Sequence, residues 1–288
     1  MYLDLRGARP PYVSRVSPFL KWVGGKRQLL PQLLRFLPHD VLRGCYYEPF
    51  IGGGALLFAL RPSSAVINDA NAELINAYRV VKTHPEEVIG LLRRYVNTEE
   101  CFYRVRALDR QPGYRRLDPI VRASRFIYLN KTCYNGLYRV NRAGEYNVPF
   151  GRYKAPHIFQ EEQILAVSSY LRQARVEILS GDYAEALRGV TREDFVYLDP
   201  PYHPLSASAN FTSYVSGGWG ERDQLRLKLE CDRLNALGVR FMLSNSCTPF
   251  ILELYSGYVV VKVSAKRSIN SNGRGRGPVD EVLIRNYE

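Results

Sequence analysis

The segment Asp199-Pro200-Pro201-Tyr202 combines a carboxylate, two rigid prolines and an aromatic ring. It follows the apolar run 195–198, which has the composition of a buried parallel strand. Ligands bind at the carboxyl edge of open α/β sheets. Because proline has no N–H to donate, the segment offers acceptors and a stacking face, which suit an exocyclic amine on a flat base. A proline-rich turn capped by Asp199 is the competing interpretation, and the preceding strand together with Tyr202 favours the ligand site.

A glycine loop provides the second cluster, with Phe50 leading into Gly52-Gly53-Gly54 after the predicted strand 45–50. The loop lacks both the dinucleotide spacing and the Lys-Ser/Thr pair of a phosphate loop. It therefore favours a nucleoside cofactor without a phosphate tail over NAD or ATP. Asp69 ends the next strand, where a carboxylate can accept hydrogen bonds from ribose hydroxyls. It could instead cap the following helix, but the nearby glycine loop favours the ribose.

Near the N-terminus, Trp22 and Lys26 are separated by a stretch that contains Gly24 and Gly25. The two glycines predict a turn that brings the ring and the cation to one point. A carboxylate would be a natural partner for Lys26. The spacing also fits a surface lysine beside a packed tryptophan.

An α/β alternation surrounds these clusters and is interrupted once. Apolar runs predict seven strands, at 45–50, 65–68, 176–179, 195–198, 239–243, 258–263 and 282–286. Periodic segments predict helices between them at 55–60, 71–82, 184–187, 222–237 and 249–255. Residues 84–172 break the pattern with helices at 85–96, 102–108 and 119–130, then a hairpin and loop at 134–153. We therefore expect one mostly parallel sheet domain (1–83 and 173–288) with a mainly helical insertion (84–172).

Composition points to a soluble protein with an anionic partner. The chain has 288 residues, a net charge of +12 and a pI near 9.5. Residues 103–154 carry twelve Arg or Lys against three acids, so most of the positive charge lies in the insertion. Five cysteines without C-x-x-C spacing favour neither a disulfide framework nor a zinc site, and no run resembles a signal peptide or membrane span. A cytoplasmic protein is expected.

The insertion also contains side chains suited to reading bases. Asn135, Leu137 and Arg139 follow Tyr134 within one Asn- and Gly-rich stretch. Arginine can bond guanine bidentately, asparagine can bond polar base edges, and leucine can contact a thymine methyl. On chemistry alone, an Asn-Gly turn with phosphate-binding cations fits this stretch better. Lys266, Arg267, Arg274 and Arg276, in a late Gly-rich loop, are expected to hold phosphates or to be solvated.

The ordered motifs FLKWVGGK, EPFIGGG, INDAN and VYLDPPY resemble the Dam family of DNA adenine-N6 methyltransferases. The resemblance runs from about 18 to 287 and is especially close to the Dpn-type methylases that modify GATC. The insertion lies between the cofactor and catalytic motifs, as in the alpha group of that family. A Rossmann-like methyltransferase fold and a role in a restriction–modification system, with a possible cognate endonuclease but no stable complex, are thereby implied. Double-stranded DNA in the nucleoid is the implied substrate.

The resemblance also implies roles for particular residues. It assigns Asp199, Pro200, Pro201 and Tyr202 to catalysis, with no metal. S-adenosylmethionine would be the methyl donor, surrounded by Trp22, Lys26, Phe50, Gly52, Asp69, Asp182 and Asp199. Lys21, Asn135, Leu137 and Arg139 would read GATC, and Tyr134 would fill the gap left by the flipped adenine. The matched segment departs from the family pattern at Cys133 and Tyr138.

The residues are consistent with this chemistry. Adenine N6 is a poor nucleophile because its lone pair is delocalised into the ring. Hydrogen bonds to the Asp199 carboxylate and the Pro200 carbonyl would localise that pair, while Tyr202 stacks on the flipped base. Two alternatives remain: an RNA or single-strand adenine methyltransferase, and a DNA-binding regulator that has lost turnover.

Overall fold

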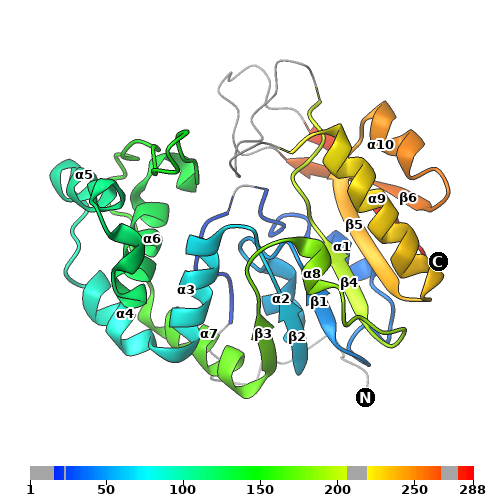
Figure 1. Ribbon diagram of the computed structural model, residues 1–288, viewed down its shortest axis with the longest axis horizontal. Coiled ribbons are helices and arrows are strands. Elements are labelled where there is room, and N and C mark those ends of the chain that lie inside the picture. The colour runs from blue at the N-terminus through cyan, green and yellow to red at the C-terminus, as the bar shows by residue number, and fades with distance from the viewer. Residues whose placement is uncertain (1–15, 23, 206–218, 267–277) are drawn as a thin grey trace.

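A seven-stranded sheet lies at the centre of the protein (Figure 1). The computed structural model describes residues 16–22, 24–205, 219–266 and 278–288. The sheet order is β3-β2-β1-β4-β5-β7-β6, with β7 antiparallel to both of its neighbours and the other pairs parallel. The strands are β1 (Tyr46–Glu48), β2 (Ser64–Ile67), β3 (Arg175–Ile178), β4 (Phe195–Leu198), β5 (Arg240–Ser246), β6 (Val259–Lys266) and β7 (Pro278–Arg285).

Side chains along each strand point alternately to the two faces of the sheet, and a hydrophobic core lies on each face. Tyr46, Phe195 and Tyr197 point into the first core, and Val196 and Leu198 point into the second. Both faces are buried because a parallel sheet is covered by its crossover helices. The first core is covered by α1 (Leu30–Phe36), α2 (Ala55–Leu60), α3 (Ala72–Thr83) and α7 (Glu161–Gln173), and the second by α8 (Tyr183–Ala186), α9 (Glu221–Ala236) and α10 (Pro249–Leu254).

The insertion extends the first core outward from α3, to the left of the sheet in Figure 1. Its elements are α4 (Pro85–Leu92), α5 (Glu99–Arg106), the short 3-10 helices η1 (Ala107–Arg110) and η2 (Tyr114–Arg116), α6 (Pro119–Thr132), η3 (Tyr134–Gly136) and α7. Asp118 caps the N-terminus of α6 and Pro119 occupies its first turn, a sequence that starts a helix strongly. Buried side chains continue without a break from the sheet into α4 and α6.

All seven strand predictions are confirmed, and so is the α/β fold class with a mostly parallel sheet. Two helices, α1 and α7, were not predicted. The short α1 has Pro31 in its first turn, and the N-cap of α7, Gln160, makes no side-chain cap. The hairpin and loop predicted at 134–153 correspond to two isolated antiparallel bridges, Cys133–Phe150 and Val140–Tyr146, without a continuous strand ladder. The division into a catalytic domain and an 84–172 domain stays a prediction.

No helix in the described part of the chain combines the length and apolar character needed to cross a bilayer.

Candidate functional site

The chain after β4 places Asp199 at the carboxyl edge of the sheet, opposite Lys26. The Lys26 ammonium lies 2.7 Å from Asp199 Oδ1 and donates a second hydrogen bond to the Gly24 carbonyl at 2.8 Å. A turn closed by the Gly25 N–H and the Trp22 carbonyl, with Gly24 at φ 75°, brings the lysine to this position. The carboxylate partner predicted for Lys26 is therefore Asp199.

Tyr202 covers the same ion pair. Its ring lies with its centroid 4.7 Å from the Lys26 ammonium, and its hydroxyl donates to Glu281 Oε2 at 2.7 Å. The Pro201 carbonyl accepts a hydrogen bond from buried Gln224 at 2.9 Å. Within the described residues, no donor reaches the Pro200 carbonyl. The Pro201 carbonyl is thus used to fix the loop, whereas the Pro200 carbonyl has no such donor among the described residues.

Burial and nearby charges set the protonation of two carboxyls at this edge. Burial raises the pKa of Asp199; the Lys26 charge opposes that rise and the Glu281 carboxylate adds to it. Glu48 lies at the end of β1 and accepts hydrogen bonds from the Tyr46 hydroxyl and the Leu57 N–H. Burial raises the pKa of Glu48 to about 8. Glu48 is thus protonated at neutral pH, whereas Asp199 has a cation beside it.

Asp69 holds the glycine loop from the end of β2. Its carboxylate accepts from the Gly52 N–H at 3.1 Å and from the Asn71 N–H at 2.9 Å. Asn71, not Asp69, caps α3, because the Asn71 side chain accepts from the N–H groups of residues 73 and 74. Gly52 has φ 47°, and a Cβ there would lie 2.6 Å from the Trp22 indole. Burial raises the pKa of Asp69 to about 6.

An aromatic wall lies beside this loop. The ring centroid of Phe50 lies 5.1 Å from that of Tyr183 and 5.6 Å from that of Trp219. The Tyr183 hydroxyl and the Trp219 N–H are buried without a partner among the described residues. Asp182 has structural partners instead: it caps α8 through the Ala184 N–H and pairs with Arg226 at 2.6 Å. A contact between Asp182 and an adenine stays a prediction.

The N-terminal segment and the insertion meet at Lys21. The Asn130 side chain accepts from the Lys21 N–H at 2.8 Å and donates to the Lys21 carbonyl at 2.7 Å. A Cβ on Gly136 would lie 2.7 Å from the Lys21 Cβ, so Lys21 abuts the η3 turn. Trp22 stacks on Tyr138, with centroids 6.2 Å apart. The structure thus brings Lys21 to the segment that was predicted to read bases.

That segment, residues 134–147, is called the reading segment below. Tyr134 is 51% exposed at its start, and Asn135 adopts φ 55° while its N–H donates to the Tyr153 hydroxyl. Leu137 is partly buried, whereas Arg139 is exposed and donates to Asn147 at 2.7 Å. The tyrosine, the asparagine and the arginine therefore have surface available to a ligand.

A basic cavity of about 740 Å³ opens beside Lys21. Among the described residues, its lining contains no carboxylate and five basic side chains: Lys21, Arg27, Lys131, Lys154 and His157. Burial, together with the charges of Lys21 and Arg27, lowers the pKa of Lys131 to about 8. Such a surface suits phosphate groups. Of the late-loop cations, Arg267, Arg274 and Arg276 lie outside the described residues, and so does the Lys266 side chain.

The family model for D12 class N6 adenine-specific DNA methyltransferases matches residues 22–269, which include the Lys26–Asp199 pair and the whole insertion. This chain belongs to that family. The expected resemblance to DNA adenine methylases and the expected enzyme class are therefore confirmed. Among the described residues of this methyltransferase, no group of three or more His, Cys, Asp or Glu side chains is arranged to hold a metal ion.

Named relatives cover nearly all of this methyltransferase. The type II methyltransferase M1.LlaDCHI of Lactococcus lactis subsp. cremoris is 43% identical over 94% of this chain and 96% of its own. The type II methyltransferase M.MjaIII of Methanocaldococcus jannaschii is 42% identical over 94% of this chain and 99% of its own. The DNA adenine methylase of Escherichia coli K12 is 36% identical, over 92% and 93% respectively.

Several residues at this methyltransferase's site were missed by sequence reasoning. Glu281 reaches Tyr202 from β7, and Asn245 of β5 holds both Gln224 and the His203 N–H. Asn68 ties the loops after β1 and β3 by donating to the carbonyls of Pro49 and Gly181, each at 3.0 Å. The sequence signal that could have identified these residues is a polar residue inside or at the end of an otherwise apolar strand, because buried polar groups need partners.

Proposed function

We propose that this D12 methyltransferase transfers a methyl group from S-adenosylmethionine to N6 of a flipped-out adenine in double-stranded GATC. The observation that carries the proposal is the Asp199 carboxylate, held by the Lys26 ammonium beneath the Tyr202 ring and followed directly in the chain by Pro200, whose carbonyl would be the second acceptor. Two adjacent acceptors and a stacking face match the two N–H groups and the flat ring of adenine.

The residues around the glycine loop fit the cofactor. Phe50 offers a ring face, and the unpartnered Tyr183 hydroxyl and Trp219 N–H offer hydrogen bonds inside the same wall. Asp69 keeps lone pairs for ribose hydroxyls while it holds Gly52. No Lys-Ser/Thr phosphate loop is present in the sequence, which agrees with a donor that has no phosphate. When bound, S-adenosylmethionine supplies an electrophilic methyl group on its sulfonium.

Asp199 and Pro200 would act on the adenine. Hydrogen bonds from N6 to the carboxylate and the carbonyl draw the amine lone pair out of the ring, and the fixed loop holds both acceptors in place. Gln224 and the Glu281-bound Tyr202 keep that loop and ring from moving. The Lys26 charge keeps Asp199 ionised despite its burial, so that it accepts rather than donates.

The insertion would select and open the target. Adenine N6 in a duplex is out of reach of a buried carboxylate, so the base must leave the stack, at a cost of a few kcal/mol. Phosphate contacts in the basic cavity offset that cost. Tyr134, which is exposed, would fill the vacated position, and Lys21, Asn135, Leu137 and Arg139 would read the bases; the contact of Lys21 with Gly136 supports a shared surface. The type II names of two relatives support a role beside a restriction endonuclease.

The decisive experiment expresses the chain in a host without DNA methylation and maps modified adenine across the genome. Modification confined to GATC is the expected result, and modification at another sequence would overturn the target. Purified enzyme with labelled S-adenosylmethionine is then offered duplex DNA, single-stranded DNA and RNA of one sequence. Preference for a single strand or RNA favours the alternative substrates, and specific binding without any labelling identifies a non-catalytic regulator.

A further inference from the structure

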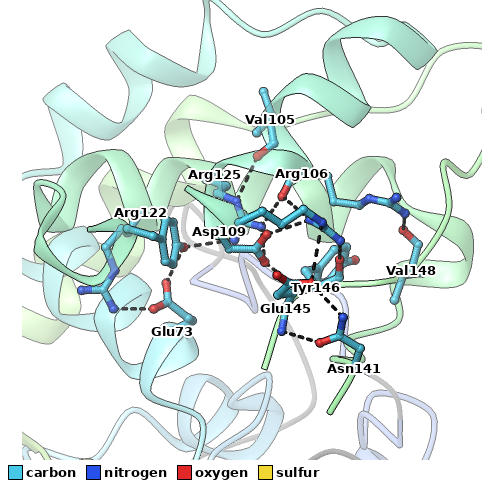
Figure 2. Close-up of polar contacts among 12 residues, drawn as sticks. Glu73, Val105, Arg106, Asp109, Arg122, Arg125, Asn141, Glu145, Tyr146 and Val148 are labelled. Atoms are coloured by element: carbon cyan, nitrogen blue, oxygen red, sulfur yellow. Dashed lines mark hydrogen bonds and ion pairs between the residues drawn. The ribbon is translucent and has the colours of Figure 1, made fainter. Parts of the chain in front are cut away.

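A buried ion pair in the insertion lies directly behind the reading segment. Arg125 of α6 and Asp109 of η1 are 2.7 Å apart, and their side chains are only 4% and 7% exposed (Figure 2). A buried ion pair costs much desolvation, so its presence is weak evidence for a purely stabilising role. The Arg125–Asp109 pair is therefore expected to have a role besides stabilisation, and the other hydrogen bonds of the two residues indicate what that role is.

Arg125 is fixed by the surrounding backbone. Its guanidinium donates to the carbonyls of Val105 and Arg106 at 3.0 and 2.8 Å and to the Tyr114 hydroxyl at 3.0 Å. These bonds join the end of α5, η2 and the middle of α6 to one planar group. Because the guanidinium cannot turn without breaking them, it presents Asp109 with a cation at a constant position.

Asp109 connects Arg125 to the reading segment. Its Oδ2 accepts the Tyr146 N–H at 2.7 Å, and neighbouring Arg110 donates to the Tyr146 carbonyl at 2.9 Å. The Tyr146 hydroxyl then donates to the Leu137 carbonyl at 2.9 Å. Both backbone polar groups of Tyr146 are thus held by side chains from η1, and the tyrosine hydroxyl holds the backbone at Leu137.

Packing supports this side of the reading segment only in part: Tyr146 is buried in the first core, and Tyr138 packs against it with ring centroids 5.7 Å apart. A second cavity of about 740 Å³ lies between η1, α6 and the segment, and Asp109, Tyr138 and Tyr146 line it. The isolated bridge between Val140 and Tyr146 is the only ladder contact that this part of the segment makes among the described residues. Polar contacts must therefore supply the rigidity that a base-reading surface needs.

The other end of the network reaches toward the cofactor edge of the sheet. Glu73, in the first turn of α3, pairs with Arg122 and accepts from the Tyr114 hydroxyl, which in turn contacts Arg125 (Figure 2). The α3 cap, Asn71, donates its N–H to Asp69. Hydrogen bonds thus connect the helix beside Asp69 with the reading segment.

We propose that Asp109, held by Arg125, is a positioning residue for target recognition, fixing the backbone from Leu137 to Tyr146 so that Leu137 and Arg139 meet the correct bases. The inference rests on the proposed function, in which the reading segment contacts DNA. Asp109 contacts no base itself, because it lies behind the segment and is buried.

Asp109→Asn is the first test, because it keeps the shape and removes the charge. We expect kcat/KM on GATC duplexes to fall about tenfold, mainly through a higher KM for DNA. Discrimination against duplexes with one changed base pair should weaken by a similar factor, while kcat and S-adenosylmethionine affinity stay within about twofold. Glu161→Gln is the matched control, since it removes one carboxylate from an exposed pair with Arg93 in the same insertion.

Tyr146→Phe provides an independent test if Asp109→Asn fails to fold. It removes only the hydroxyl that reaches Leu137 and leaves the buried ion pair intact. The same loss of discrimination is expected, in a protein with a melting temperature near that of the wild type. Unchanged discrimination in folded Tyr146→Phe, or equal effects of Asp109→Asn and Glu161→Gln, would overturn the proposal.

Failure of the proposed function would be visible separately. If the wild-type enzyme does not prefer GATC duplexes, the proposed target sequence is wrong, and this result does not depend on any variant. The site that it does prefer then replaces GATC as the reference sequence for the variants. The positioning role is judged only from the difference between variant and wild type on that reference.

Discussion

The Lys26 ammonium lies 2.7 Å from the Asp199 carboxylate and under the Tyr202 ring, although the two charged residues are 173 positions apart in the chain. Lys26 is 5% exposed and Asp199 is 21% exposed. At this burial, the charge of one partner strongly affects the protonation of the other. Glu281 raises the pKa of Asp199 and Lys26 lowers it, so two charges act in opposite directions on the same carboxyl.

Replacing Asp199 should separate catalysis from DNA binding. In Asp199→Ala, the amine loses its ionised acceptor, and methyl transfer should fall by at least about 1,000-fold. Duplex affinity should stay within about threefold, because in the proposed function the DNA contacts come from the basic cavity and the reading segment and not from Asp199. Labelled-methyl transfer and gel-shift titration measure the two properties. Retained turnover in this variant would exclude Asp199 as the acceptor.

The pH dependence of turnover should shift in opposite directions in two variants. Methyl transfer requires ionised Asp199, so activity is lost as the pH falls through its pKa. Lys26→Met removes the charge that lowers this pKa, and the acidic limb of kcat should move up by about one unit or more. Glu281→Gln removes a charge that raises the pKa of Asp199, and the limb should move to lower pH.

Both profiles are measured at saturating DNA and cofactor, so that changes in binding do not enter kcat. Glu281→Gln retains an oxygen that can accept the Tyr202 hydroxyl and therefore tests the charge more than the contact. If the acidic limb of kcat shifted in the same direction in both variants, the group that titrates there would not be Asp199.

Arg139 should determine one base pair of the target. Arg139→Ala should cost about 1–3 kcal/mol at the cognate site and relax discrimination at a single position. Arg142→Ala is the charge-matched control, because Arg142 is exposed in the neighbouring turn. Methylation of duplexes with each single base-pair change provides the measurement. A uniform loss across all sequences, equal in both variants, would identify Arg139 as a phosphate contact instead.

Glu48 should make stability fall as the pH rises. Its pKa is about 8 in the folded protein against an ordinary value of 4.5, so the folded state keeps a proton that the unfolded chain releases. The free energy of unfolding should therefore fall between about pH 4.5 and pH 8, on the order of 5 kcal/mol over the full range. This contribution is complete below about pH 4.5 and is lost by about pH 8.

The variant Glu48→Gln tests this dependence. Glutamine mimics the protonated acid, and its oxygen can accept from Tyr46 and Leu57 as Glu48 does. Urea unfolding at pH 6 and pH 8.5 should give a smaller loss of stability in the variant than in the wild type. Parallel losses in both proteins would mean that Glu48 is already ionised at the lower pH.

Local sequence patterns predicted most of the fold because they act over a few residues. Apolar runs bounded by glycine, proline and acids located all seven strands, including β4 with its correct ends. The reading segment was harder, since its Asn, Gly and Tyr content fits a hairpin as well as an irregular loop. Its backbone is held by Asp109 and Tyr146 side chains rather than by a strand ladder.

The sequence by itself determined the motifs, their order along the chain and their place at the carboxyl ends of β1, β2 and β4. It therefore predicted that Asp199, the glycine loop at 52–54 and Asp69 lie at the same edge of the sheet. Only the tertiary structure decided the partners: Lys26 for Asp199, Glu281 for Tyr202, and Asn130 for Lys21. These contacts join residues far apart in the chain, and they depend on how helices and strands pack, which no local pattern encodes.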